Sequence, residues 1–368
     1  MRLCAPCLFG IEGVLADELK RLGADKVEAQ NGRVLFSGDG AMLARANIQS
    51  RFAERIQILV GSFAAHSFEE LYQGVKALPW ADYIGKLDRF PVKGWSLNST
   101  LHSIPDCQSI VKKAVVDKLN QTYHQARFAE TGALYQIQFT ILKDEVSLLL
   151  DTSGAGLHKR GYREISGAAP LKETLAAAIA DLARARRAER IFDPCCGSGT
   201  LLIEAALQAA KIAPGKSRRF AAEDWALAPA AVWQEERERA ISFEQPDRLP
   251  ALFGSDIDSE VLTLCRDNAE KAGVAKNLET AVRDLRNFEP LGDSGTVLCN
   301  PPYGERLLDV KTAQTLIREM GKVFVEKPGW NYAIISPDED FETLFGRPAK
   351  KRRKLYNGML KCTLYMYF

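Results

Sequence analysis

The chain lacks the features of membrane-inserted, secreted and polybasic proteins. No uninterrupted apolar run approaches the 18 residues that a transmembrane helix needs, and the N-terminus passes through Arg2, Pro6 and Glu12 without the apolar core of a signal peptide. Forty-nine Lys and Arg stand against 47 Asp and Glu, so any nucleic-acid site must be a local patch rather than a charged tail. We therefore expect a soluble, cytoplasmic protein.

A disulfide framework and a complete zinc motif are also missing. The eight cysteines are scattered, which is typical of free thiols in a reducing compartment. Cys4 and Cys7 form a lone C-x-x-C, but tetrahedral zinc needs four ligands, and no second pair at this spacing and no nearby histidine completes the set. We expect both thiols to be buried, as unpaired cysteines usually are.

The first 155 residues present two α/β patterns, which we expect to form domains at 1–55 and 56–155. In the first, apolar residues recur at helical spacing up to Gly23, and 33–37 alternates as a strand. In the second, Tyr135, Ile137, Phe139 and Ile141 alternate with polar residues, the pattern of a strand with one buried face. Further elements are expected at 56–60, from 68, near 95, at 110–119 and at 146–150.

A different pattern begins after a basic linker at 156–170. This linker contains His158, Lys159, Arg160 and Arg163. Residues 171–368 alternate longer helices with short apolar strands, which predicts a doubly wound parallel sheet covered by helices on both faces. Four strands end in polar residues, and ligands of such sheets bind at the carboxyl ends of the strands. The four are Asp193, Asp256, Asp284 and Asn300.

The segment Asp193-Pro-Cys-Cys-Gly-Ser-Gly-Thr200 joins the first of these strands to the helix predicted at 201–210. Glycines at 197 and 199 permit a tight turn, and the helix N-terminus offers free N–H groups to an anionic ligand group. A dinucleotide fingerprint would need a third glycine where Leu202 stands, and no Gly-Lys-Ser/Thr follows. A purely structural turn is the alternative.

Carboxylates at the next two strand ends outline a nucleoside site. Asp256 is suited to two ribose hydroxyls, and Asp284 to an adenine amine. The alternative is that each is a helix N-cap. That alternative applies better to Asp256, which precedes a helix from Ser259, than to Asp284, which no strong helix pattern follows.

Asn300-Pro-Pro-Tyr303 is the most specific motif in the chain. Its prolines fix φ and remove backbone donors, so the Asn300 side chain and the Pro301 carbonyl can be held rigidly as acceptors for an exocyclic amine. Tyr303 adds an aromatic face on which a planar base can stack. A structural proline turn is the alternative.

These motifs resemble those of a known family. Residues 193–200 look like the first motif of class I S-adenosylmethionine-dependent methyltransferases, and 300–303 looks like the N-P-P-Y motif of the amino-methylating branch. Residues 157–163, 169–173 and 353–359 are similar to the bacterial ribosomal RNA guanine-N2 methyltransferases, whose members are often labelled N6-adenine-specific DNA methylases. In that family a THUMP-type RNA-binding region precedes the catalytic domain, and the resemblance covers essentially the whole chain.

The resemblance implies an α/β fold, with a class I (Rossmann-like) methyltransferase domain after an α+β THUMP-type region whose first 55 residues are ferredoxin-like. It implies S-adenosylmethionine as cofactor, no metal because the sulfonium is already the electrophile, and the N2 amine of a guanine in 23S ribosomal RNA as target. RNA contacts are expected from the four linker residues. The implied catalytic residues are Asn300, Pro301, Pro302 and Tyr303, and the implied cofactor residues are Asp193, Pro194, Cys195, Gly197, Ser198, Gly199, Thr200, Asp256, Ile257, Asp284 and Asn300.

Other functions share parts of this pattern. N6-adenine methylation of DNA and glutamine methylation of a translation factor both use N-P-P-Y chemistry. A non-catalytic RNA-binding or ribosome assembly factor could keep the same methyltransferase fold.

Two further segments stand out in the sequence. Asp193 and Asp256 lie far apart in the sequence because 213–250 intervenes, a segment that resembles the family's own insertion. The basic run at 350–354 is ordinarily a solvated face. We also expect cofactor binding to survive removal of residues 1–155.

Overall fold

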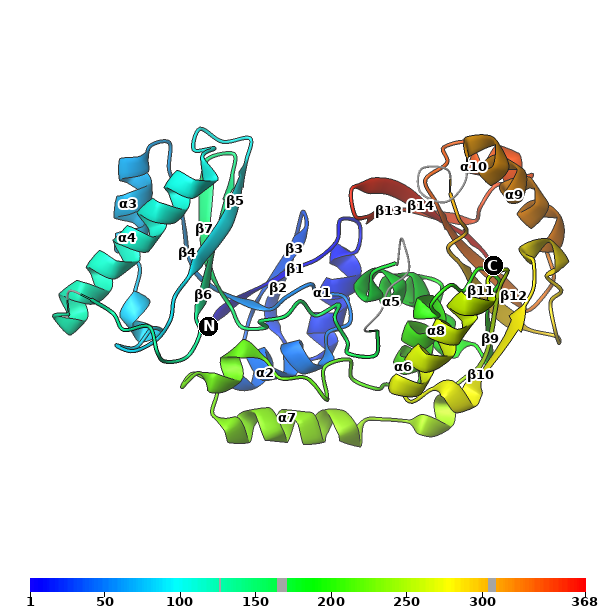
Figure 1. Ribbon diagram of the computed structural model, residues 1–368, viewed down its shortest axis with the longest axis horizontal. Helices are drawn as coiled ribbons and strands as arrows, with labels where there is room; N and C mark the ends of the chain where they lie inside the picture. The colour runs from blue at the N-terminus through cyan, green and yellow to red at the C-terminus, as the bar shows by residue number, and fades with distance from the viewer. Residues whose placement is uncertain (126, 164–170, 304–308) are drawn as a thin grey trace.

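The computed structural model describes residues 1–125, 127–163, 171–303 and 309–368. This part of the chain contains two seven-stranded sheets. We call residues 1–151, which hold the first sheet, the N-terminal unit, and residues 171–368, which hold the second, the C-terminal unit. Figure 1 shows the first sheet over the left and centre of the view and the second at the right.

The N-terminal sheet has the strand order β2-β3-β1-β4-β7-β6-β5. Helices α3 and α4 pack together beside its β4–β7 part, and α1 and α2 lie with β1–β3 (Figure 1). No helix in the described ranges is long and apolar enough to cross a membrane. The elements are β1 (Arg2–Pro6), α1 (Glu12–Arg21), β2 (Asp25–Gln30), β3 (Arg33–Ser37), α2 (Gly40–Gln49), β4 (Gln57–Ala64), α3 (Phe68–Lys76), β5 (Val92–Leu97), α4 (Ile104–Tyr123), β6 (Gln136–Leu142) and β7 (Glu145–Asp151).

Hydrophobic periodicity predicted the elements of this unit well. The helical spacing before Gly23 forms α1, and Gly23 itself adopts a φ of 94°, a left-handed conformation suited to glycine. The alternating strand forms β6, where Ile137, Phe139 and Ile141 are fully buried. Cys4 and Cys7 are both buried, as expected.

The C-terminal sheet has the order β10-β9-β8-β11-β12-β14-β13. Its first five strands are parallel, which confirms the predicted type of sheet. Strand β14 runs antiparallel to β12 and pairs antiparallel with β13, so that β13 and β14 form a terminal hairpin. The elements are α5 (Glu173–Leu182), β8 (Arg190–Asp193), α6 (Thr200–Ala209), α7 (Ala230–Ser242), β9 (Ala251–Asp256), α8 (Ser259–Lys271), β10 (Leu278–Val282), β11 (Gly295–Cys299), α9 (Val310–Val323), β12 (Trp330–Ser336), α10 (Phe341–Phe345), β13 (Lys351–Asn357) and β14 (Leu360–Tyr367).

The insertion at 213–250, between α6 and β9 of the C-terminal unit, packs on the N-terminal unit. Helix α7 runs below α2 in Figure 1, and Arg45 of α2 binds both carboxylate oxygens of Glu236, at 2.8 and 2.6 Å. The Trp225 ring stacks on Tyr135 with 4.2 Å between centroids, and its Nε1 donates to the Leu134 carbonyl. The insertion therefore clamps the two units together.

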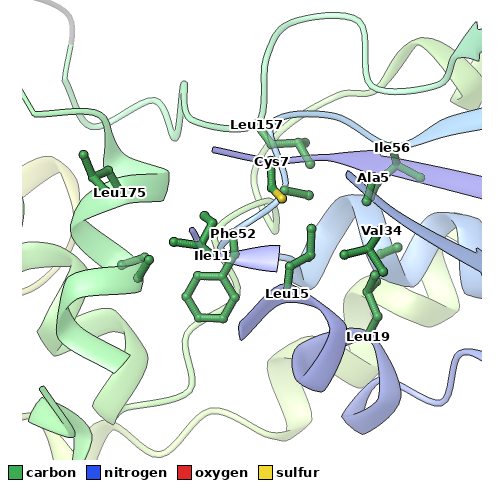
Figure 2. Close-up of a cluster of buried hydrophobic side chains, with 14 of the residues drawn as sticks. Ala5, Cys7, Ile11, Leu15, Leu19, Val34, Phe52, Ile56, Leu157 and Leu175 are labelled. Carbon is green, nitrogen blue, oxygen red and sulfur yellow. The ribbon is translucent and has the colours of Figure 1, made fainter. Parts of the chain in front are cut away.

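One apolar core crosses from the N-terminal unit into the C-terminal unit. Figure 2 shows Ile11 and Phe52 of the N-terminal unit in the same cluster as Leu157 of the linker and Leu175 of α5. All four side chains are at most 2% exposed. Burial of apolar side chains across the junction favours one fixed arrangement of the units.

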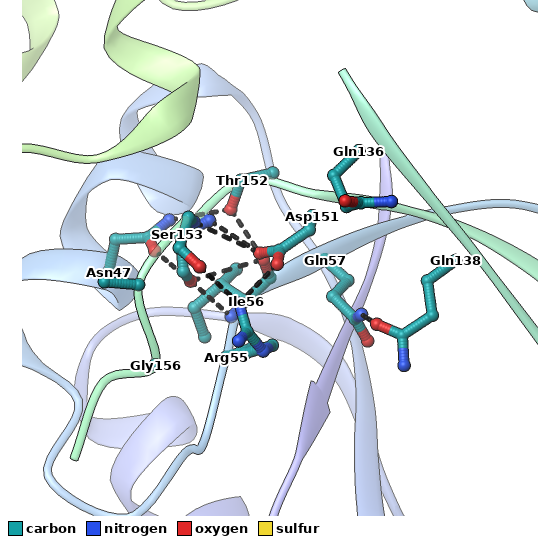
Figure 3. Close-up of polar contacts among 12 residues, drawn as sticks. Asn47, Arg55, Ile56, Gln57, Gln136, Gln138, Asp151, Thr152, Ser153 and Gly156 are labelled. Atoms are coloured by element: carbon teal, nitrogen blue, oxygen red, sulfur yellow. Dashed lines mark hydrogen bonds and ion pairs between the residues drawn. The ribbon is translucent and has the colours of Figure 1, made fainter. Parts of the chain in front are cut away.

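A buried polar network fixes the end of β7 where the chain leaves the N-terminal sheet (Figure 3). Asp151 forms an ion pair with Arg55. Asn47 of α2 donates to Thr152 Oγ1 at 2.9 Å and accepts from Ser153 Oγ at 2.6 Å. Because these buried groups find partners in α2 and beside β4, the start of the linker has a defined path.

Candidate active site

The four polar strand ends come together along one edge of the C-terminal sheet. Strands β10, β9, β8 and β11 are parallel neighbours in that order, so their carboxyl ends face the same side. Asp193 and Asp256 are the last residues of β8 and β9, Asn300 directly follows β11, and Asp284 lies two residues beyond β10. The edge runs from Asp284 through Asp256 and Asp193 to Asn300.

The loop between β8 and α6 depends on its two glycines. Gly197 and Gly199 have φ values of 50° and 81°, in the left-handed region. A Cβ at position 199 would lie 2.6 Å from Cys265 Sγ on α8, so only glycine lets the loop approach that helix. A Cβ at position 197 would meet only Val261, at 4.0 Å, so the backbone there stays open. The loop presents the N-terminus of α6, which begins at Thr200.

Asp193 is buried beneath this loop. Its side chain accepts a hydrogen bond from the Cys195 backbone N–H at 3.1 Å, and the residue is 2% exposed. Burial, reinforced by the charge of Asp256, raises the pKa of Asp193 to about 8 despite that hydrogen bond. Asp193 therefore supports the loop from inside the protein. The more accessible side of the loop is formed by Cys195, Gly197 and Ser198.

Asp256 is not a helix cap. The N-cap of α8 is Asp258, whose side chain accepts from the backbone N–H groups of Glu260 and Val261. Asp256 Oδ2 instead accepts from the Gly197 N–H at 3.0 Å, and Oδ1 accepts from Asp258 at 3.2 Å. Each oxygen keeps a lone pair for a hydroxyl donor. Beside it, Ile257 is 72% exposed, an apolar surface that a planar ring could cover.

Asp284 is a helix cap, although the sequence favoured this interpretation less for it than for Asp256. It caps a short 3₁₀ turn, Leu285–Asn287, by accepting from the Arg286 N–H. The Arg286 guanidinium also binds both its oxygens, at 3.0 and 2.5 Å, and these bonds lower the pKa of Asp284. Its carboxylate can still accept a further donor but is already neutralised.

The Asn300–Tyr303 segment runs from the edge that carries the four polar strand ends to a pocket. Asn300 Oδ1 is buried and has no hydrogen-bond partner among the described residues, which is unusual for a buried acceptor. Tyr303 lies at the pocket, and its hydroxyl accepts from Asn357 Nδ2 at 2.7 Å. The pocket has a volume of about 200 Å³ and is lined by Pro301, Pro302, Tyr303, Val310, Ala313, Leu316, Ile317, Ser336, Pro337, Asp338 and Leu360.

Most of the basic residues of the linker, from which we expect RNA contacts, are turned into the protein. Arg160 is buried, where its Nε lies 3.4 Å from Glu204 Oε1, and the Arg163 Nη2 lies 3.1 Å from Glu173 Oε2. Buried arginines need such partners because an unpaired charge is costly away from water. His158 is half-buried, and only Lys159 of the four linker residues is exposed. Residues 164–170, which include part of the 169–173 resemblance, lie outside the described residues.

Two residues near the site were not identified from the sequence. Asp338 follows β12 and lines the pocket, and Asn357 at the end of β13 bonds to Tyr303. Asn357 lay inside the 353–359 segment that carried the resemblance, so a signal for it existed. No sequence pattern pointed to Asp338.

The edge of the sheet fits a nucleoside-containing cofactor such as S-adenosylmethionine. Gly197, Ser198 and the α6 N-terminus would hold the amino-acid part, Asp256 the ribose, and Ile257 with Asp284 the base. The observations that support this fit are the open backbone at Gly197, the exposed Ile257 and the unpartnered Asn300 oxygen. Among the described residues, no group of three His, Cys, Asp or Glu side chains is placed to hold a metal ion.

Comparison with family models assigns three segments of the chain. Residues 160–366 match the methyltransferase domain described as RMKL-like, residues 2–57 match the RlmL ferredoxin-like domain, and residues 65–151 match the THUMP domain. The first match covers more than half of the chain.

Individual proteins match over the full length. A Bacillus subtilis protein named "Putative RNA methyltransferase YpsC" is 42% identical over 371 residues, covering 100% of this chain and 95% of that protein. The structure of SMU.472, described as "a putative methyltransferase complexed with SAH", is 41% identical with a TM-score of 0.94 and covers 100% and 97% of the two chains. A Listeria monocytogenes structure described as "a predicted N6-adenine-specific DNA methylase" is 43% identical with a TM-score of 0.91, over 100% and 96%.

Proposed function

This chain belongs to the RMKL-like methyltransferase family and uses S-adenosylmethionine, and we propose that it methylates the exocyclic N2 amine of a guanine in 23S ribosomal RNA. The N-terminal unit, with its match to the THUMP domain, would bind the RNA, and the C-terminal unit would modify one base. The name of the Bacillus subtilis relative supports RNA as the substrate. The motifs shared with the ribosomal RNA guanine-N2 methyltransferases support the large-subunit target.

The observation that carries the proposal is the buried Oδ1 of Asn300 beside the pocket, which has no hydrogen-bond partner in the part of the chain that the structure describes. A buried acceptor without a donor is satisfied when an amine N–H enters the site. The Pro301 carbonyl, next to it, can take the second N–H of the same amine. With both hydrogens held, the nitrogen lone pair points toward the electrophilic methyl group that S-adenosylmethionine supplies when bound.

Asp338 supports guanine over adenine as the base. Beside its N2 amine guanine carries an N1–H donor, whereas adenine carries an N1 acceptor beside its N6 amine. A carboxylate only accepts hydrogen bonds. At the edge of a bound base it therefore favours the N1–H of guanine and repels the N1 lone pair of adenine. Asp338 lines the same pocket as Tyr303, and its oxygens are held by the Asp340 N–H at 2.8 Å and by Gln314 Nε2 at 3.2 Å. Each oxygen retains a lone pair for the base.

RNA contacts are proposed from the exposed surface rather than from the whole linker. Lys159 is the linker cation open to solvent, and Lys351 and Lys354 of β13 are also exposed. Phosphate contacts of this kind make affinity fall steeply with salt, by a log–log slope of roughly 0.7 to 0.9 per contact. Removing one contact, as in Lys159→Ala, should therefore make the log–log slope shallower by roughly 0.7 to 0.9.

In the decisive experiment, the full-length protein is incubated with labelled S-adenosylmethionine and either unmodified 23S ribosomal RNA or DNA. The methylated nucleoside is then identified. N2-methylguanosine in the RNA is expected. N6-methyl-2′-deoxyadenosine in DNA as the only product would overturn the proposal. Intact cofactor binding without transfer to either nucleic acid would indicate a non-catalytic binding protein.

The role of Asp338 is tested separately with Asp338→Asn. The amide can donate as well as accept, so discrimination against adenine should weaken and turnover on guanine should fall by about tenfold or more, the value of one hydrogen bond to a charged group. Glu339→Gln is the matched control, since Glu339 is the adjacent exposed carboxylate. Equal turnover of both variants would remove Asp338 from base recognition.

A further inference from the structure

The last residue of β13 holds the aromatic ring that would stack on the target base. Asn357 is 6% exposed, and its Nδ2 donates to the Tyr303 hydroxyl at 2.7 Å. The two residues lie 54 positions apart in the sequence. They meet because β14 pairs antiparallel with β12, which is next to β11 in the sheet, and β13 pairs with β14 in the terminal hairpin.

The hydrogen bond restrains the end of Tyr303 that its backbone cannot. Two prolines immediately before Tyr303 restrict the chain at its Cα. The hydroxyl lies on the ring axis, so a bond to it fixes the direction in which the ring points, even though the ring can still rotate about that axis. With both ends held, the ring axis stays in place beside the pocket that Tyr303 lines.

We infer that Asn357 is a positioning residue for base stacking by Tyr303. This inference rests on the proposed function, because it assumes that Tyr303 contacts the target base. Asn357 itself touches neither cofactor nor base in this assignment. It acts by keeping the ring axis in the direction that stacking requires, so that fewer motions of the ring have to be restricted when the base enters.

The same strand is docked on the N-terminal unit. Arg353 Nε donates to the Gly10 carbonyl at 2.7 Å, and the rings of Phe9 and Tyr356 meet edge to face at 5.9 Å. Figure 1 shows the β13–β14 hairpin reaching from the C-terminal sheet toward the N-terminal unit. The strand that orients Tyr303 is thus also fixed to the unit proposed to bind RNA, which keeps the stacking ring in register with the bound substrate.

The test compares Asn357→Leu and Tyr303→Phe, which remove the hydrogen bond from opposite ends, in single-turnover methylation of the RNA. Each should lower the rate by about tenfold, the value of one such bond. The double variant should be no slower than either single variant, since both lose the same interaction. Cofactor affinity should not change. Asn357→Asp, which can accept from the Tyr303 hydroxyl, should recover most of the rate.

Controls separate this inference from the proposed function. Tyr303→Ala removes the ring, so wild-type turnover of that variant would overturn the stacking role itself. A slow Tyr303→Ala variant together with wild-type rates for Tyr303→Phe and Asn357→Leu would overturn the positioning role alone. A double variant whose rate falls by the product of the two single effects would do the same.

Met359→Ala, in the same hairpin and 96% exposed, should behave as wild type. Should Asn357→Leu fail to fold, Tyr303→Phe breaks the same bond without altering β13, and a wild-type rate for it overturns the inference.

Discussion

At the scale of single residues, the three aspartates at the strand ends have different tasks despite similar positions. Asp193 is buried and supports the loop, Asp256 connects that loop to β9, and Asp284 is paired with Arg286. Their sequence contexts look alike because each follows an apolar strand. Their neighbours, which come from other elements, determine which carboxylate is available to a ligand.

Asp256→Ala should weaken S-adenosylmethionine binding by about 1.5 to 3 kcal/mol, the usual value of a charge-assisted hydrogen bond. The reason is the loss of the ribose acceptor together with the bond to Gly197. Calorimetric titration measures the change. Asp258→Ala is the matched control, because it removes the α8 cap and should lower thermal stability while leaving cofactor affinity unaltered. Equal affinity of both variants would assign Asp256 a structural role only.

Asp193→Asn should change the pH dependence of stability. The pKa of Asp193 is about 8 in the folded protein, against an ordinary value near 3.8 in the unfolded chain. The folded state therefore binds the proton more tightly, and this residue's contribution to stability is full below about pH 4 and is lost as the pH rises through about 8. Chemical denaturation of the cofactor-free protein at pH 5 and pH 8 should show a smaller difference for the variant than for wild type. An unchanged difference would contradict the raised pKa.

At the scale of elements, the contact between β13 and the loop before α1 leaves no room for a side chain. Gly10 has a φ of 95°, and a Cβ there would lie 2.1 Å from the Lys354 carbonyl oxygen. Because the obstacle is backbone, β13 would have to move away. This contact explains why the basic run at 350–354 is more than a solvated face: Arg353 and the Lys354 backbone meet the N-terminal unit.

Gly10→Ala should destabilise the protein and slow RNA methylation, because moving β13 also moves Asn357. Gly273→Ala is the control: Gly273 has a φ of 76° but nothing within 4 Å of its Cβ position, so it carries only the backbone cost of about 1 kcal/mol. The clash at Gly10 should add about 1 to 3 kcal/mol beyond that. Urea denaturation of the two variants measures the difference between their free energies of unfolding. Equal losses of stability in the two variants would mean that β13 adapts without strain.

At the scale of the whole molecule, the two units form one folded body. The shared core, the α2–α7 contact and the stacking of Trp225 on Tyr135 all cross the junction. Arg51 of the N-terminal unit is buried and donates to the carbonyls of Leu207 and Ile212 at the C-terminal end of α6, where a cation is favourable. The N-terminal unit therefore supplies the cation that binds carbonyl groups at and just beyond the C-terminal end of α6.

Removal of residues 1–155 should leave a chain that fails to fold, contrary to the expectation from sequence that it would keep cofactor binding. The deletion exposes the apolar surface around Leu175 and leaves α7 without α2. Circular dichroism and cofactor titration of the 156–368 fragment test this. A cooperatively folded fragment that binds S-adenosylmethionine would show that the junction is dispensable for the C-terminal unit.

Glu54→Gln should reveal the electrostatic part of the junction. Burial alone would raise the pKa of Glu54, but contacts from His158, Thr174 and Lys172 outweigh it and hold the pKa at about 2. The stabilisation is present above the ordinary pKa near 4.5 and is lost as the pH falls through about 2. The free energy of unfolding of wild type should exceed that of the variant by on the order of 2 kcal/mol at pH 7, and this difference should shrink as the pH falls. A gap that is constant with pH would contradict the lowered pKa.

The sequence by itself determined the elements, and it predicted a chemistry for the edge where the polar strand ends lie. Apolar spacing set α1, β6 and the parallel strands of the C-terminal sheet, because side-chain direction repeats with the local backbone period. The two glycines and the Asn300–Tyr303 motif indicated a cofactor edge and an amine acceptor, because those functions need short, contiguous segments of special backbone geometry.

Only the tertiary structure decided which charged groups are available and what holds the site in place. Arg160 and Arg163 look like a basic surface in the sequence but are paired with Glu204 and Glu173 inside the protein. Asn357 reaches Tyr303 across 54 positions, and the insertion reaches the N-terminal unit through α7. Such pairings depend on how strands and helices from distant parts of the chain are stacked, and local spacing carries no record of that arrangement.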